Sequence, residues 1–274
     1  MLVLAGAVLA APAAEDVARK EFPFEYRDGL IWVQVEVRES RAPLNFLLDS
    51  GAGLSVVNMS TLQRIGRLRG KRISVRGVGR NATGYWPQRL GVTDDSLPVA
   101  KDVLAVDLSE LSRTCARTVD GLVGADFFKR FVVQVDFKES RLRLDPVGAA
   151  STGEVSLPLQ LHGDSLRVPI SVNGRPAQWV RLDTGCAGAL HWVSAGADAR
   201  SGEPHVSVGL APLKVPIIRA SVQLGSVKFD SVRTGMHAKE IFAGEAGLLG
   251  NELLSQFRSV TIDTRVGRVV LEPR

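Results

Sequence analysis

The chain of 274 residues is poor in the residue types that bind metals or form disulfides, with two cysteines and four histidines. The histidines are scattered and show none of the short spacings of a zinc site, so we expect no metal and no cofactor. In an oxidising compartment Cys115 and Cys186 could pair, but two cysteines alone do not establish a disulfide.

Basic clusters and long apolar runs are also missing. The net charge of +5 is spread along the chain, so the sequence does not indicate nucleic-acid binding in spite of a pI near 9.5. An apolar stretch at residues 2–10 is too short to span a bilayer, and we expect no integral membrane span in the mature chain. The small residues at 11–13 follow it, so residues 1–14 are predicted to be a signal peptide or its remnant, although a basic region is lacking.

The residues that are abundant favour β structure. The chain has 27 glycines, 13 prolines and many valine-rich alternating runs. Short helices are predicted only after Gly124 and Gly250 and at residues 60–65. A small, polar, unpatterned stretch at residues 146–153 is typical of a linker, and the length suffices for two lobes, at 15–148 and 149–274.

Two short segments of the chain are nearly the same. Residues 46–53 read FLLDSGAG and residues 180–187 read VRLDTGCA. Each places one aspartate, a hydroxyl residue and a glycine at the end of an apolar strand. Either segment alone would be weak evidence of a catalytic site, because Asp-Ser-Gly and Asp-Thr-Gly are ordinary turn tripeptides.

The surroundings of these two segments repeat as well. Residues 120–131 read DGLVGADFFKRF, residues 246–257 read AGLLGNELLSQF, and a pair of strands is predicted after each. We interpret this as a tandem duplication. Two carboxylates a few ångströms apart cannot both ionise, so one keeps a proton as an acid while the other acts as a base on a shared water.

With these paired motifs, residues 33–271 resemble the aspartic proteases, specifically the bacterial retropepsin-like group in which two lobes are fused in one chain. The resemblance implies an all-β fold of two pseudo-two-fold-related acid-protease β-barrel lobes, with short helices after the apolar-apolar-Gly motifs. It implies Asp49 and Asp183 as the catalytic pair. The residues that would support the catalytic loops are Ser50, Gly51, Thr184 and Gly185.

Aspartic proteases cover their substrate with a flexible hairpin that has glycine at its tip, and residues 71–92 suit such a flap. The flap and substrate-binding residues predicted here are Gly77, Val78, Gly79 and Tyr85 in the first half and Gly209 in the second. A phosphate loop at residues 77–79 is a poor alternative, because no helix with Lys-Ser/Thr follows. Tyr85 and Trp86 either contact substrate or pack against the lobe.

Three positions of the second half depart from the first. Cys186 stands where Ala52 stands, and we expect it to be a small buried hydrophobe. Arg181 matches Leu47 and can point outward from a strand of alternating faces, so it does little harm to the assignment. His191 is expected to be a loop or surface residue.

Two classes of function are compatible with these features. The first is an aspartic endopeptidase acting on a peptide or unfolded protein, as a monomer with an intrachain pseudo-dimer. The alternative is a catalytically inactive protein of the same fold that binds peptides or acts as a scaffold. The presence of both aspartates and both hydroxyls favours the peptidase. The expected location is periplasmic or secreted, in a bacterium, with membrane anchoring by an uncleaved N-terminus as the second choice.

Overall fold

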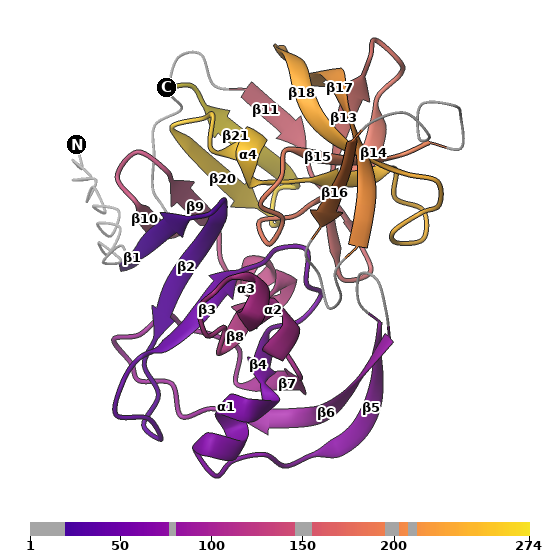
Figure 1. Cartoon of the computed structure of the whole chain (residues 1–274). Coiled ribbons are helices and arrows are strands. Elements are labelled where there is room, and N and C mark those ends of the chain that lie inside the picture. The colour runs from indigo at the N-terminus through magenta and orange to yellow at the C-terminus, as the bar shows by residue number, and fades with distance from the viewer. Residues whose placement is uncertain (1–19, 77–80, 146–154, 195–202, 208–212) are drawn as a thin grey trace, which may run out of the picture.

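The computed structural model describes residues 20–76, 81–145, 155–194, 203–207 and 213–274 (Figure 1). The predicted signal peptide (1–14) and the predicted linker (146–153) lie outside these ranges. Strands account for 50% of the residues and helices for 10%, so the fold is all-β as predicted. We call residues 20–145 the first half and residues 155–274 the second half.

The elements follow one another in a similar order in the two halves. The strands of the first half are β1 (Lys20–Arg27), β2 (Leu30–Val35), β3 (Leu44–Leu48), β4 (Val56–Asn58), β5 (Lys71–Arg76), β6 (Asn81–Arg89), β7 (Asp102–Val106), β8 (Gly121–Val123), β9 (Val133–Asp136) and β10 (Arg141–Leu144). Those of the second half are β11 (Val155–Pro158), β12 (Gln160–His162), β13 (Ser165–Val172), β14 (Gln178–Leu182), β15 (Leu190–Val193), β16 (Glu203–Ser207), β17 (Leu213–Leu224), β18 (Val227–His237), β19 (Gly247–Leu249), β20 (Ser259–Asp263) and β21 (Arg268–Glu272).

The helices of the described residues are short: α1 (Met59–Arg64), α2 (Ser109–Thr114), α3 (Ala125–Arg130) and α4 (Asn251–Leu254). Helices α3 and α4 confirm the prediction after Gly124 and Gly250, and α1 confirms the one near residues 60–65. At the start of α1, the Asn58 side chain accepts a hydrogen bond from the Ser60 amide at 3.3 Å, which caps the helix. Helix α2 is not among the helices that the sequence predicts.

The strands form two sheets, and the larger one contains strands from both halves. Its order is β11-β21-β20-β9-β10-β1-β2-β3-β8-β4-β7-β6-β5, and the smaller sheet has the order β12-β13-β14-β19-β15-β18-β17-β16. The two halves join where β9 pairs antiparallel with β20, and Figure 1 shows these strands side by side between the indigo-magenta and orange-yellow halves. Val133 and Val135 of β9 are buried and alternate with a half-buried Gln134, the period expected of a sheet with one covered face.

Within each half, the strands around the two aspartate motifs pair in the same way. In the first half β3 runs parallel to β8, β8 antiparallel to β4, and β4 parallel to β7. In the second half β14 runs parallel to β19, β19 antiparallel to β15, and β15 parallel to β18. Each apolar-apolar-Gly motif therefore supplies the central strand, β8 or β19, next to the strand that leads to an aspartate.

Buried apolar side chains form one cluster that runs through both halves and a second, smaller cluster beside β3 and β8. The smaller cluster includes Trp32, Leu47, Val56 and Leu122. Across the described part of the chain, no helix has the length and apolar character needed to cross a membrane.

Candidate active site

The two aspartates lie directly after β3 and β14, where a neighbouring parallel strand fixes the backbone. The amide of Asp49 donates to the carbonyl of Val123 in β8, and the amide of Asp183 donates to the carbonyl of Leu249 in β19, both at 2.9 Å. Each aspartate is thus held to the buried strand of an apolar-apolar-Gly motif.

The structure brings the two carboxyl groups together, in hydrogen-bond contact with each other. Oδ1 of Asp49 accepts from the amides of Gly51 (3.1 Å) and Ala52 (3.0 Å), and Oδ1 of Asp183 accepts from the amide of Gly185 (3.0 Å). A Cβ atom at Gly51 would lie 2.4 Å from Cγ of Asp183, and one at Gly185 would lie 2.4 Å from Cγ of Asp49. Only glycine fits at these two positions, because each loop packs its backbone against the other loop's carboxyl group.

Ser50 and Thr184 connect the two loops beneath the carboxyl groups. The Ser50 hydroxyl donates to the carbonyl of Leu182 at 2.8 Å, and the Thr184 hydroxyl donates to the carbonyl of Leu48 at 2.9 Å. Both side chains are buried, with 0% and 1% of their surface exposed. These hydrogen bonds run between the halves, so they fix the separation of the aspartates.

The pKa values of the two aspartates are both raised, and burial is the largest cause for each. Burial and the neighbouring charge of Asp49 raise the pKa of Asp183 to about 8, and Asp183 is 8% exposed. Burial also raises the pKa of Asp49, while amide hydrogen bonds and the bond from Asp183 oppose that rise. A pKa of about 8 keeps Asp183 protonated at neutral pH, so its carboxyl group can donate a hydrogen bond toward Asp49.

The pair faces a cleft of about 480 Å³, a volume in the range of small-molecule and peptide subsites. Both aspartates line it, and so do Gly51 and Gly185. The rest of the lining is mostly apolar and comes from the first half: Leu47, Leu54, Val56, Leu104, Val106, Leu108, Leu111 and Leu122.

A hairpin also borders this cleft, at the place predicted for a flap. Strands β5 and β6 pair antiparallel up to Arg76 and Asn81, and Ile73, Ser74 and Val75 of β5 line the cleft. Strands β16 and β17 form a second hairpin at the corresponding place in the second half. The predicted tip residues Gly77, Val78, Gly79 and Gly209 lie outside the described residues.

Tyr85 does not lie with the other predicted site residues. Its side chain is half-buried on β6 and packs against the large hydrophobic cluster. Trp86 likewise packs, against the smaller cluster, and the described lining of the cleft includes neither ring. Both aromatic side chains serve packing in this structure.

The outward orientation considered for Arg181 is wrong, because the side chain points inward. It is 9% exposed and lines the cleft. Its Nε and Nη2 donate to the Glu245 carboxylate at 2.7 and 2.8 Å, and its Nη1 donates to the carbonyl of Gly51 at 2.7 Å. The guanidinium lies 3.6 Å from the centre of the Phe242 ring. This positive charge lowers the pKa of both aspartates, against the larger effect of burial.

Glu245 is the centre of a buried polar cluster that the sequence did not indicate. Besides Arg181, it accepts from the Ser165 hydroxyl at 2.6 Å and from Nε of Arg167 at 3.4 Å. These hydrogen bonds and the two positive charges hold its pKa below the usual range, against burial. The four residues come from β13, β14 and the chain before β19, so no local pattern could have grouped them.

The prediction for His191 is also wrong: it is a buried residue of β15, not a loop or surface residue. Its Nδ1 lies 2.8 Å from Nε2 of His237 on the adjacent strand β18. Burial lowers the pKa of His237, which favours its neutral form.

Both cysteines are free, so Cys115 and Cys186 do not pair. Cys186 is half-buried and next to the aspartate loops, and burial raises its pKa above the usual range. Its sulfur lies 2.9 Å from where a Cβ atom of Gly250 would stand. A thiol with a raised pKa is a poor nucleophile, in keeping with a packing role.

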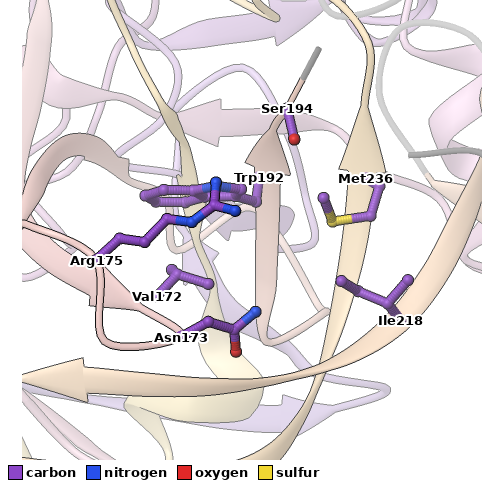
Figure 2. Close-up of a pocket in the computed structure, with 7 residues that line it drawn as sticks. All are labelled: Val172, Asn173, Arg175, Trp192, Ser194, Ile218 and Met236. Atoms are coloured by element: carbon purple, nitrogen blue, oxygen red, sulfur yellow. The ribbon is translucent and has the colours of Figure 1, made fainter. Parts of the chain in front are cut away.

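A second pocket lies in the second half and contains no comparable chemistry (Figure 2). Its volume of about 20 Å³ holds roughly one water molecule. The seven labelled residues of Figure 2 include one charged side chain, Arg175, and no carboxyl group.

The described residues contain no cluster of three or more histidine, cysteine, aspartate or glutamate side chains that could hold a metal ion. The chain matches no protein-family model and no curated protein. Its chemistry is therefore inferred from the site itself.

Proposed function

We propose that the chain is an aspartic endopeptidase that hydrolyses peptide bonds with a water molecule activated between Asp49 and Asp183. The observation that carries this proposal is the contact between the carboxyl groups of the half-buried Asp49 and the buried Asp183, which both line a cleft. Two carboxyl groups in contact cannot both ionise, so one keeps a proton and the pair can act as acid and base.

The arrangement of protons suits this reaction. The deprotonated carboxyl of Asp49 takes a proton from water as the water oxygen attacks the peptide carbonyl carbon. Asp183 gives its proton to the carbonyl oxygen, which forms a neutral tetrahedral diol. The diol then collapses when the amide nitrogen takes the proton held by Asp49 and leaves, while Asp183 recovers its proton from a hydroxyl of the diol. Protons balance over the cycle, and neither carboxyl group forms a covalent bond to the substrate.

We further propose that the two halves are pseudo-two-fold-related acid-protease lobes. The recurring strand pairing around β8 and β19 and the reciprocal contacts of Gly51 and Gly185 support this symmetry. Each half would contribute one aspartate, so one chain would form a site without a second subunit.

The substrate would be an extended peptide or an unfolded protein segment. The cleft runs between the aspartate loops and β5, whose residues Ile73, Ser74 and Val75 line it. An extended chain can pair with such a strand by main-chain hydrogen bonds while its side chains fill the apolar lining. Export to the periplasm or secretion rests on the N-terminal sequence alone, and N-terminal sequencing of the mature protein checks it.

The test is cleavage of an unfolded protein by the purified chain and by Asp49→Asn and Asp183→Asn. We expect each variant to lose nearly all turnover and to keep its fold, with the double variant little worse than either single one. Asp164→Asn is the control, because Asp164 also lines the cleft but is exposed and pairs with Lys129. Turnover that persists in Asp183→Asn, or a wild-type chain that binds the protein without cleaving it, would refute the proposal.

A further inference from the structure

The two sides of the aspartate pair differ in chemistry. On the first-half side, the strands β3, β8, β4 and β7 present an apolar wall to the cleft. Leu47 pairs in register with Leu122, Leu122 with Val56, and Val56 with Leu104. Val106, two residues further along β7, lines the cleft as well.

The second half has polar residues at three of the matching positions. Along β14, β19, β15 and β18 the same registers pair Arg181 with Leu248, Leu248 with His191, and His191 with Gly235. His237 stands two residues beyond Gly235, where the first half has Val106 two residues beyond Leu104. Where the first-half wall has leucine and valine, the second-half wall therefore has Arg181 lining the cleft, with His191 and His237 buried and outside the described lining.

Arg181 keeps hydrogen-bonding capacity on this wall. A guanidinium has five N–H donors and no acceptor. Three donors are used by Glu245 and the Gly51 carbonyl, which leaves one N–H on Nη1 and one on Nη2. The ion pair and Phe242 fix the plane of the group, so these donors are held in place at the cleft.

The Glu245 cluster brings positive charge to this side of the cleft, beside the carboxyl groups of Asp49, Asp183 and Asp164, which also line it. Arg181 and Arg167 share a single carboxylate, that of Glu245, so the buried cluster carries one excess positive charge. An oxygen atom with partial or full negative charge complements such a wall, an aliphatic group would leave the donors unsatisfied, and an ammonium group would be repelled.

We propose that the cleft selects two different substrate side chains: an apolar one on the Leu47 side and one with a terminal acceptor oxygen, as in glutamine or glutamate, on the Arg181 side. This inference depends on the proposed peptidase function. Arg181 acts as a specificity-determining residue. The buried pair of His191 and His237 occupies positions that are apolar in the first half.

The test uses peptides that differ at one residue, placed in turn on either side of the scissile bond, with leucine, glutamine, glutamate or lysine there. We expect kcat/KM to favour leucine on one side. On the other side we expect glutamine to exceed leucine by about ten-fold, with lysine the poorest. Arg181→Leu, which copies Leu47, should make leucine the preferred residue on both sides, whereas Arg175→Leu should change neither preference.

The outcomes separate this inference from the proposed function. Cleavage with an apolar preference on both sides in the wild-type chain would overturn the inference and leave the peptidase intact. A glutamine preference that persists in Arg181→Leu would overturn it as well. No cleavage of any peptide would contradict the peptidase itself. Because Arg181→Leu leaves the Glu245 charge buried, the double variant Arg181→Leu/Glu245→Gln serves if the single one does not fold.

Discussion

Ser50 and Thr184 exchange hydrogen bonds across the centre of the molecule. The Ser50 amide donates to Oγ1 of Thr184 at 2.9 Å, and the Thr184 amide donates to Oγ of Ser50 at 3.0 Å. Each hydroxyl also donates to a carbonyl of the opposite half, so its donor and one acceptor position are both used. The aspartate loops are therefore connected by four hydrogen bonds that depend on two hydroxyl groups.

Replacing one of these hydroxyls should reduce stability strongly. Thr184→Val keeps the side-chain shape but leaves the Ser50 amide and the Leu48 carbonyl without partners in a buried position. We expect the free energy of unfolding in urea to fall by about 3 kcal/mol, since each unsatisfied buried group costs about 1–3 kcal/mol. Thr264→Val removes one hydrogen bond, to the Phe128 carbonyl, and should cost less. Equal effects of the two substitutions would contradict this role of Thr184.

The stability of the chain should depend on pH through Asp183. Its pKa is about 8 in the folded state and near 4 when unfolded, so the folded state binds the extra proton between these values. The contribution of Asp183 to stability is then present below about pH 4 and is lost as the pH rises to 8. Asp183→Asn removes this titration and should gain stability relative to wild type, by a few kcal/mol over that interval. Urea unfolding at pH 4.5, 6 and 8 measures it, and a difference independent of pH would contradict it.

The close approach of the loops should make Gly51 intolerant of a side chain. In Gly51→Ala the new Cβ atom would collide with the Asp183 carboxyl group, and the loop would have to move. We expect cleavage to fall by about 100-fold, because displacements near 1 Å have effects of this size. Gly188→Ala is the matched control, as its Cβ atom would lie 3.8 Å from the nearest atom, Nε2 of His191. Similar activity of the two variants would show that the contact at Gly51 is unimportant.

Cys186 should be replaceable by alanine. Alanine is the residue at the matching position, Ala52, and the half-buried site would lose one sulfur atom. We expect Cys186→Ala to retain activity and both proteins to be indifferent to reductant. Assays with and without dithiothreitol measure this, and a reductant effect seen only in the wild type would show that the thiol is a redox switch.

Much of the fold could be predicted because its signals are local. The helices α3 and α4 follow the repeated glycine motifs, and each of the two aspartates comes directly after the last residue of a predicted strand. The contact between Asp49 and Asp183 followed from the repetition of a motif, which requires no knowledge of distant contacts. The joining of the halves through β9 and β20 could not be predicted, because strand pairing across the chain has no signature within either strand.

The wrong predictions for Arg181 and His191 have a common physical cause. Alternation between a buried and an exposed strand face predicts a solvent-facing Arg181. Here the second face borders a cleft, and the partner of Arg181, Glu245, lies 64 residues away in the sequence. His191 is stabilised in the core by His237, 46 residues further on. A buried polar residue can be recognised from sequence only when its partner is nearby, and neither partner is.

The pairing of β9 with β20 has a consequence for how the chain can change over evolution. Besides side-chain contacts such as those of Gln134 with Ser259 and Thr261, this junction contains main-chain hydrogen bonds, which most substitutions leave unaffected. Side chains elsewhere in one half can therefore be exchanged without loosening its attachment to the other half. The second half can therefore carry Arg181, His191 and His237 at positions where the first half has leucine and valine, while the aspartates stay aligned. The side chains around the aspartate can thus differ between the halves.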